Sequence, residues 1–169
     1  LAALCAVRLF HNDASHRLLA FIAAHPENQH VEACELELFR HYFQQKRWND
    51  ALAWAARVDL APLQPADQEE FRFKRGYAFF QQGDTEKALG DFHTVQQGTG
   101  TYAAPATYYA AHIHYERGNY ETALQGFEKL KTDEGFGRVV PYYIAEILFL
   151  QGNYEELQQY VKPLLEDPN

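Results

Sequence analysis

Hydrophobic residues recur along most of this chain at spacings of three and four positions, in segments separated by short polar stretches. Such a period is typical of amphipathic helices, whose apolar residues line one side. The pattern predicts an all-α protein of about ten helices in five antiparallel pairs. Their approximate spans are 1–10, 14–25, 29–45, 48–60, 67–82, 85–96, 102–117, 120–131, 137–151 and 154–166.

The boundary inside each predicted pair carries a recurring residue, here called the marker. Gly83, Gly118 and Gly152 are markers spaced 35 and 34 residues apart, and Lys46 takes the same place 37 residues before Gly83. Glycine accepts the left-handed backbone conformation with which many helices end. A period near 34 residues is typical of arrays of helix–turn–helix units.

Residues on both sides of the marker also recur. The next position is Asp84, Asn119 or Asn153, which are suitable N-cap residues for the second helix. Small residues precede the three glycine markers by seven positions, whereas Lys46 has Phe39 there. Alanine followed four residues later by alanine or phenylalanine comes after three of the four markers. We expect these small and large side chains to interlock where the paired helices meet. They are Gly76, Ala111 and Ala145 before the markers, and Ala51, Ala55, Ala88, Phe92, Ala123 and Phe127 after them.

The segments "RFKRGYAF", "ALGDF" and "ALQGF" resemble the tetratricopeptide-repeat (TPR) pattern, which has a glycine in the first helix and A-x3-F in the second. The resemblance implies a TPR-like α-solenoid whose helix pairs stack into a right-handed superhelix. It departs from the family in lacking the tryptophan of each unit. Leu157 and Val161 also replace the alanine and phenylalanine of the last unit.

The repeats predict one solenoid domain over residues 1–169, with a divergent pair at 1–28 and units at about 29–62, 66–98, 101–132 and 136–167. "FIAAHPEN" and the segment after it resemble bacterial cell-envelope TPR proteins of the Bacteroidetes type. That resemblance favours a bacterial periplasm or envelope over the cytoplasm. Because "DPN" resembles a junction between repeats, we expect the array to continue beyond the C-terminal end. Leu157 and Leu164 of the last helix would then be exposed and could mediate homo-oligomerisation.

The net charge and the lack of a long apolar run exclude some classes of binding partner, and the two cysteines have two possible states. The formal net charge of −8 argues against nucleic acids and anionic membranes, which attract dense lysine and arginine. No run of eighteen apolar residues could span a bilayer. Cys5 and Cys34 are expected to be buried thiols, with a disulfide between them as the alternative in an oxidising compartment.

Catalytic and metal-binding motifs are missing from the sequence. There is no G-x-S-x-G elbow, P-loop, dinucleotide glycine pattern or H-E-x-x-H. His30 and Cys34 are one helical turn apart and could share a metal ion, but two ligands do not make a site. We expect no catalytic residue, no cofactor and no metal site.

The first helix of each unit supplies the expected binding surface, because it lines the concave face of such a solenoid. Sites three, six and ten residues before each marker share one side of the helix and are mostly aromatic. The row nearest the markers could instead be core. The predicted groove residues are Phe43, Phe80, Tyr115 and Phe149 in that row, then Arg40, Tyr77, His112 and Glu146, and finally Leu36, Phe73, Tyr108 and Tyr142.

Tyrosine-rich surfaces bind extended peptides or helices through a large contact area at a low entropic cost. The sequence therefore predicts a non-catalytic scaffold that binds a peptide or helix of a partner protein in this aromatic groove. A carboxylate-gripping clamp of Lys, Arg and Asn, found in some TPR domains, is not present at these sites. The alternative is a structural array that associates with itself or packs against the rest of its own chain.

Overall fold

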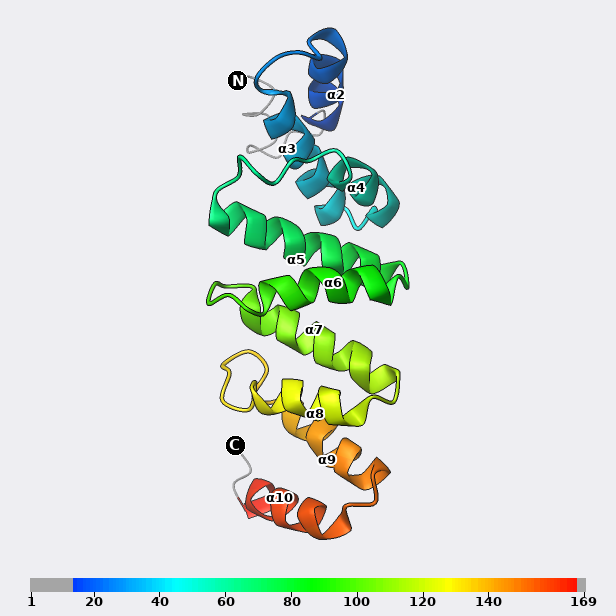
Figure 1. The fold of residues 1–169 in the computed structure, drawn as a ribbon, viewed down its shortest axis with the longest axis vertical. Helices are drawn as coiled ribbons and strands as arrows, with labels where there is room; N and C mark the ends of the chain where they lie inside the picture. Colours follow the sequence, from blue (N-terminus) through cyan, green and yellow to red (C-terminus); the bar gives the residue numbers. More distant parts are fainter. Residues whose placement is uncertain (1–13, 167–169) are drawn as a thin grey trace. The chain divides into compact units, whose positions relative to one another are not determined.

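The structure, a computed structural model, describes residues 14–166, and every regular element within that range is an α-helix (Figure 1). The predicted helix over residues 1–10 lies outside the described residues. The nine described helices match the other nine predicted spans, with small differences at their ends. They are α2 (Ala14–Ala24), α3 (Val31–Gln44), α4 (Trp48–Ala55), α5 (Pro65–Gln81), α6 (Thr85–Val95), α7 (Ala103–Glu116), α8 (Tyr120–Glu128), α9 (Val140–Leu150) and α10 (Tyr154–Glu166).

Two compact units divide the chain between Asp91 and Phe92, within α6. In the first unit α2 packs on α3, α3 on α4 and α4 on α5. Its core includes Phe39 and Phe71, whose rings are 4.7 Å apart. In the second unit α7 packs on α8, α8 on α9 and α9 on α10, around a core that includes Phe127. Sequential neighbours thus supply the packing in each unit, as expected for helical repeats.

The four markers, one in each helix–turn–helix repeat, end their helices in the same way. Gly83, Gly118 and Gly152 have φ angles of +77°, +74° and +74°, and Lys46 has φ 58°. The N–H of each marker donates to the carbonyl three residues back, and the next N–H donates to the carbonyl five residues back. This is the Schellman arrangement, which satisfies two carbonyls at a helix end. A Cβ at any of the three glycines would contact nothing within 4 Å, so backbone conformation alone favours glycine there.

The residues after the markers cap the second helices less uniformly than predicted. The Asp84 carboxylate accepts a hydrogen bond from the backbone N–H of Lys87, as an N-cap residue should. Asn119 makes no side-chain capping bond. The Asn153 amide instead donates to the side chain of Gln151 at 3.3 Å.

Most of the recurring small residues are buried, whereas Ala145 is half-buried. Ala51, Ala88 and Ala123 are fully buried. The second unit has one still closer approach, between α7 and α8, where a Cβ on Gly126 would lie 2.7 Å from the Cβ of Ala111. Only a residue without a side chain lets the two helices come this near.

Two second helices end earlier than predicted. The helix expected over 48–60 stops at Ala55, and the one expected over 120–131 stops at Glu128. Val58 and Leu60 then pack against the first core cluster from an irregular segment, and Leu130 is buried in the second core. Their apolar side chains extended the helical pattern in the sequence, but the chain buries them without continuing the helix.

The last hairpin corrects one expectation about exposure. Leu157 is half-buried and packs on the second core cluster, although it was expected to be exposed. Leu164 is 45% exposed, and the neighbouring Leu165 is 79% exposed. The side of α10 that carries Leu157 therefore covers α9, while the Leu164–Leu165 end stays in solvent.

Candidate functional site

In the first unit, the predicted groove residues fall into different environments. Leu36 is only 6% exposed and belongs to the core cluster that also contains Leu18 of α2. Leu36 is therefore corrected to a core residue, because the packing of α2 on α3 takes this position out of solvent. Phe73 and Phe80 are half-buried, each with its ring centroid 6.4 Å from that of Tyr77.

Phe43 and Tyr77 meet a residue that the sequence reasoning missed, Trp48 at the start of α4. The three rings pack mutually edge to face, with centroid distances of 5.4 Å for Phe43–Trp48, 5.9 Å for Phe43–Tyr77 and 5.7 Å for Trp48–Tyr77. Such arrangements are favoured over flat stacking by the quadrupoles of the rings. All three are half-buried, so the cluster both joins α3, α4 and α5 and leaves ring surface accessible.

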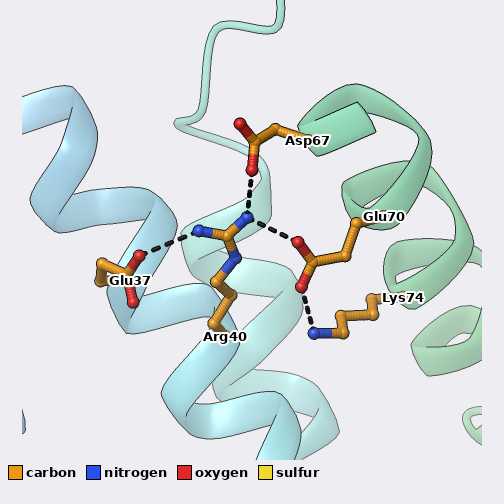
Figure 2. A network of polar contacts seen from close by, with 5 residues as sticks. All are labelled: Glu37, Arg40, Asp67, Glu70 and Lys74. Atoms are coloured by element: carbon orange, nitrogen blue, oxygen red, sulfur yellow. Dashed lines mark hydrogen bonds and ion pairs between the residues drawn. The ribbon is translucent and has the colours of Figure 1, made fainter. Parts of the chain in front are cut away.

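Arg40, the one cation among the predicted groove residues, lies at the centre of an ionic network (Figure 2). Its guanidinium donates to Glu37 at 2.9 Å, Asp67 at 2.7 Å and Glu70 at 2.6 Å, and Glu70 also pairs with Lys74. Burial alone would lower the pKa of Arg40, but the hydrogen bonds to Asp67 and Glu70 raise it above its usual value. Arg40 therefore links α3 to α5 and is not available for a partner's carboxylate.

In the second unit, the three groove residues of α7 stack along one side of the helix. The rings of Tyr108 and His112 are nearly parallel at 6.1 Å, and those of His112 and Tyr115 are nearly parallel at 6.3 Å. Tyr143 of α9 stands edge-on to this stack, 5.7 Å from His112 and 5.4 Å from Tyr115. The Tyr108 and Tyr143 hydroxyls are 3.3 Å apart, within hydrogen-bonding distance.

Tyr143 was missed because the spacing from the marker selected Tyr142. A signal was present: Tyr143 lies three residues after Val140 and four before Ile147, both of which are buried in the second core. Tyr143 also stands nine residues before its marker, and so does Lys74 in the first unit, whose ammonium lies 5.6 Å from the Phe43 ring. In both compact units, this residue contacts an aromatic side chain of the preceding first helix. Lys74 contacts Phe43 and Tyr143 contacts Tyr115, and each of these aromatic residues stands three positions before its own marker.

The predicted groove residues of α9, which are Tyr142, Glu146 and Phe149, form an exposed row. Tyr142 is 76% exposed and has no ring contact within the part of the chain described, and Phe149 is 57% exposed with its ring 5.9 Å from Tyr154. Glu146 lies between them on the same side of the helix. Burial, and then a hydrogen bond to Glu146, raise the pKa of Tyr115 to about 12. The exposed row of α9 therefore connects to the half-buried rings of α7.

The phenols of Tyr108 and Tyr115 are neutral at neutral pH, because the pKa of each lies above its usual value. Burial, followed by the hydrogen bond to Tyr143, raises the pKa of Tyr108 well above its usual value. Neutral phenols can donate and accept hydrogen bonds but are poor bases. The arrangement suits recognition by ring area and hydroxyl groups.

Metal-binding side chains do not gather anywhere in residues 14–166: no group of three or more histidine, cysteine, aspartate or glutamate residues could hold an ion there. Cys34 is a buried thiol whose pKa is raised chiefly by burial, and Cys5 lies outside the described residues. Among the described helices, none is long and apolar enough to cross a membrane.

Solved structures resemble this fold over most of the chain. MamA matches with a TM-score of 0.70 and 22% identity, covering 90% of this chain and 85% of its own. A tetratricopeptide-repeat protein from Parabacteroides merdae matches with a TM-score of 0.68 and 22% identity, covering 90% of this chain and 58% of its own. The fold is that of a TPR solenoid.

A third similar structure is described as a kinesin light chain with nearly identical TPR-like repeats, from Podosopora anserina. It has a TM-score of 0.62 and 13% identity, and covers 98% of this chain and 90% of its own. No family model and no curated protein matches the sequence. At identities this low, these matches show the TPR fold alone.

Proposed function

We propose that this TPR protein is a non-catalytic scaffold that binds a peptide or helix of a partner protein across the exposed row of α9. One observation carries the proposal: Tyr142 and Phe149 hold aromatic side chains in solvent on one side of α9, with the carboxylate of Glu146 between them. Aromatic side chains that lie in solvent are enriched at protein interfaces, where their burial supplies most of the binding energy.

The half-buried rings of α7 would form the part of the binding surface next to this row. Tyr143 packs between the α7 stack and the core residue Phe127, at 4.7 Å from the latter. Tyr115 in turn holds Glu146 by a hydrogen bond. These contacts reduce the freedom of the exposed row before a partner arrives, which lowers the entropic cost of binding.

The test compares exposed and half-buried aromatics of the same unit. A partner is first captured with the 169-residue chain, and its affinity is then measured by titration calorimetry. Tyr142→Ala and Phe149→Ala should each weaken binding about tenfold or more, because an interface hot spot is worth about 2 kcal/mol, and neither should lower the melting temperature appreciably. Leu165→Ala, which removes an exposed side chain from α10, is the matched control and should leave affinity unchanged.

Tyr108→Ala has a different expected outcome. Tyr108 contacts Phe136 at 4.7 Å and Phe127 at 6.1 Å, so its removal should cost about 3 kcal/mol or more of unfolding free energy. If partner affinity survives both α9 substitutions, the exposed row is not the binding surface and the proposal fails.

The alternative, self-association, is favoured by the clustering of exposed apolar side chains on the last hairpin. Of the large exposed hydrophobic residues described, all but one lie between Val139 and Leu165. Exposed apolar side chains promote association between copies of a chain where they gather on one surface. We expect sedimentation velocity to detect dimers at high protein concentration, and Leu165→Glu to shift them to monomers, since a charge at an apolar interface is costly. A monomer at every concentration would contradict this alternative.

A further inference from the structure

An open crevice in the first unit contains none of the predicted groove residues. The end of α4, the middle of α5 and the middle of α6 line it, and its volume is about 500 Å³. That size falls in the range of ligand-binding clefts in proteins. Its lining is Leu52, Ala56, Arg72, Arg75, Phe79, Lys87, Gly90 and Asp91.

The crevice residues of α5 lie on a different side of the helix from its aromatic residues Phe73 and Tyr77. Arg72, Arg75 and Phe79 are three and four residues apart and share one side of the helix, whereas Phe73 and Tyr77 share another. Each residue advances the helix by about 100°, so the two sides point in clearly different directions. A ligand of the crevice would not compete for the ring surface of Tyr77.

The apolar part of the crevice can accept a side chain. Leu52, Ala56 and Phe79 supply carbon surface. Gly90 is exposed on α6, and a Cβ built on it would meet nothing within 4 Å. Space therefore remains directly above the α6 backbone, where most helices present a side chain.

The charged part of the crevice includes one unpaired cation. Arg75 donates to both carboxylate oxygens of buried Asp91, at 2.8 and 2.7 Å, and the Lys87 ammonium pairs with Asp84 at 2.7 Å. Arg72 is half-buried and forms no hydrogen bond or ion pair with any residue in the described range. An arginine fork held near apolar surface suits a carboxylate, which it can bind through two parallel hydrogen bonds.

We propose that this crevice binds a peptide segment of a partner protein in which an apolar side chain stands beside a carboxylate. The apolar side chain would lie over Leu52, Phe79 and Gly90, and the carboxylate would accept hydrogen bonds from Arg72. Charge complementarity favours this occupant: the crevice has three cationic side chains and one carboxylate, although the whole chain carries a formal net charge of −8. Binding here is independent of the exposed row of α9.

The test uses a short fluorescent peptide in which two leucines are flanked by glutamates. Fluorescence anisotropy gives its affinity for the 169-residue chain, and amide chemical shifts in NMR spectra locate it. We expect saturable binding that shifts the resonances of Leu52, Gly90 and their neighbours. A peptide with glutamine in place of glutamate, and one with serine in place of leucine, should each bind about tenfold more weakly or worse.

Protein variants test the two halves of the crevice separately. Arg72→Glu should weaken binding of the acidic peptide by about tenfold or more, with an unchanged melting temperature because no ion pair is lost. Arg138→Glu is the matched control, since Arg138 is exposed and also unpaired within the described residues, and it should leave the affinity unchanged. Gly90→Trp should fill the space above α6 and abolish binding of every peptide.

Several outcomes would overturn the proposal. One is an acidic peptide that fails to bind the wild-type chain at millimolar concentration. Another is equal loss of affinity in Arg72→Glu and Arg138→Glu, which would mean attraction by net charge alone. A third is binding whose chemical shifts map to α7 and α9 and that survives Gly90→Trp, which would place the peptide on the second unit.

Discussion

Lys46 is the one non-glycine residue with a positive φ in the described chain, and it ends α3 as the three marker glycines end their helices. A lysine in this conformation costs about 1–2 kcal/mol, because its Cβ crowds the backbone. The sequence placed Lys46 in the glycine slot by alignment of the repeats alone. Its backbone conformation follows from the two Schellman hydrogen bonds, which this turn shares with the others.

Replacing this lysine should stabilise the protein. Lys46→Gly removes the left-handed penalty but increases the entropy of the unfolded chain, so the net gain should be about 0.5–1 kcal/mol. Thermal and urea denaturation followed by circular dichroism would measure it. Gly118→Ala is the reciprocal control and should destabilise by about 1 kcal/mol, since its Cβ would touch nothing and only the backbone penalty is added. Equal stability of Lys46→Gly and wild type would contradict this account.

At the residue scale the candidate site was only partly predictable. Spacing from the markers found Tyr108, His112 and Tyr115, which do stack on one another, because side chains on one side of a helix follow from its period alone. It missed Trp48, which packs on Phe43 and Tyr77, and Tyr143, which packs on the α7 stack; each comes from a neighbouring helix. Contacts between helices depend on their packing angle and offset, which the period of one helix does not contain.

At the scale of the elements, ion pairs join helices whose packing the apolar pattern predicts only in general. Arg40 of α3 reaches Asp67 and Glu70 of α5, and Arg57, just after α4, donates to the buried carboxylate of Glu35 on α3 at 2.7 Å. Nothing in the spacing of these residues predicts the pairs. Groups separated by 22 to 30 positions meet only after the hairpins have packed.

The Arg40 network should make stability sensitive to acid. Burial alone would raise the pKa of Glu70, but hydrogen bonds from Lys74 and Arg40 lower it below the usual value. The resulting stabilisation is present above the unfolded-state pKa of about 4.3 and is lost as the pH falls through the lower folded-state pKa. We expect the melting temperature to fall between about pH 5 and pH 3, and to fall less steeply in Glu70→Gln.

Glu134→Gln provides the comparison for this experiment. Glu134 is exposed and unpaired among the described residues, so its removal should leave the acid dependence of the melting temperature as in wild type. Identical slopes for Glu70→Gln, Glu134→Gln and wild type would mean that the Glu70 ion pairs contribute nothing to stability.

At the scale of the whole molecule, burial is distributed unevenly among the helices. α10 has no buried residue and contains Pro163, which lacks the N–H for a helical hydrogen bond, whereas α3 and α7 each have five or more buried residues. The sequence predicted the repeat array and its helix pairs well, because the glycine, the small residues and the apolar residues recur at the same positions in most of the repeats. The number of residues that a helix buries was less predictable, because it depends on which other helices pack against it.

This unevenness should be visible as a gradient of protection. Local opening costs little where few apolar contacts are lost, so amide hydrogens of α10 should exchange fastest and those of α3 and α7 slowest. Hydrogen exchange measured by mass spectrometry on peptides from each helix would test this. Protection of α10 equal to that of α7 would indicate that a second copy of the chain covers α10, and dilution should then restore its fast exchange.

The Schellman turns at Lys46, Gly83, Gly118 and Gly152 have a consequence for synthesis on the ribosome. Each turn forms hydrogen bonds only three and five residues back, and α4, α8 and α10 each pack on the helix just before them. A hairpin can therefore close as soon as its own residues have emerged, without waiting for distant segments. Chains with such short-range contacts have low contact order and fold quickly, so the nascent chain exposes little more than one unpaired repeat at a time.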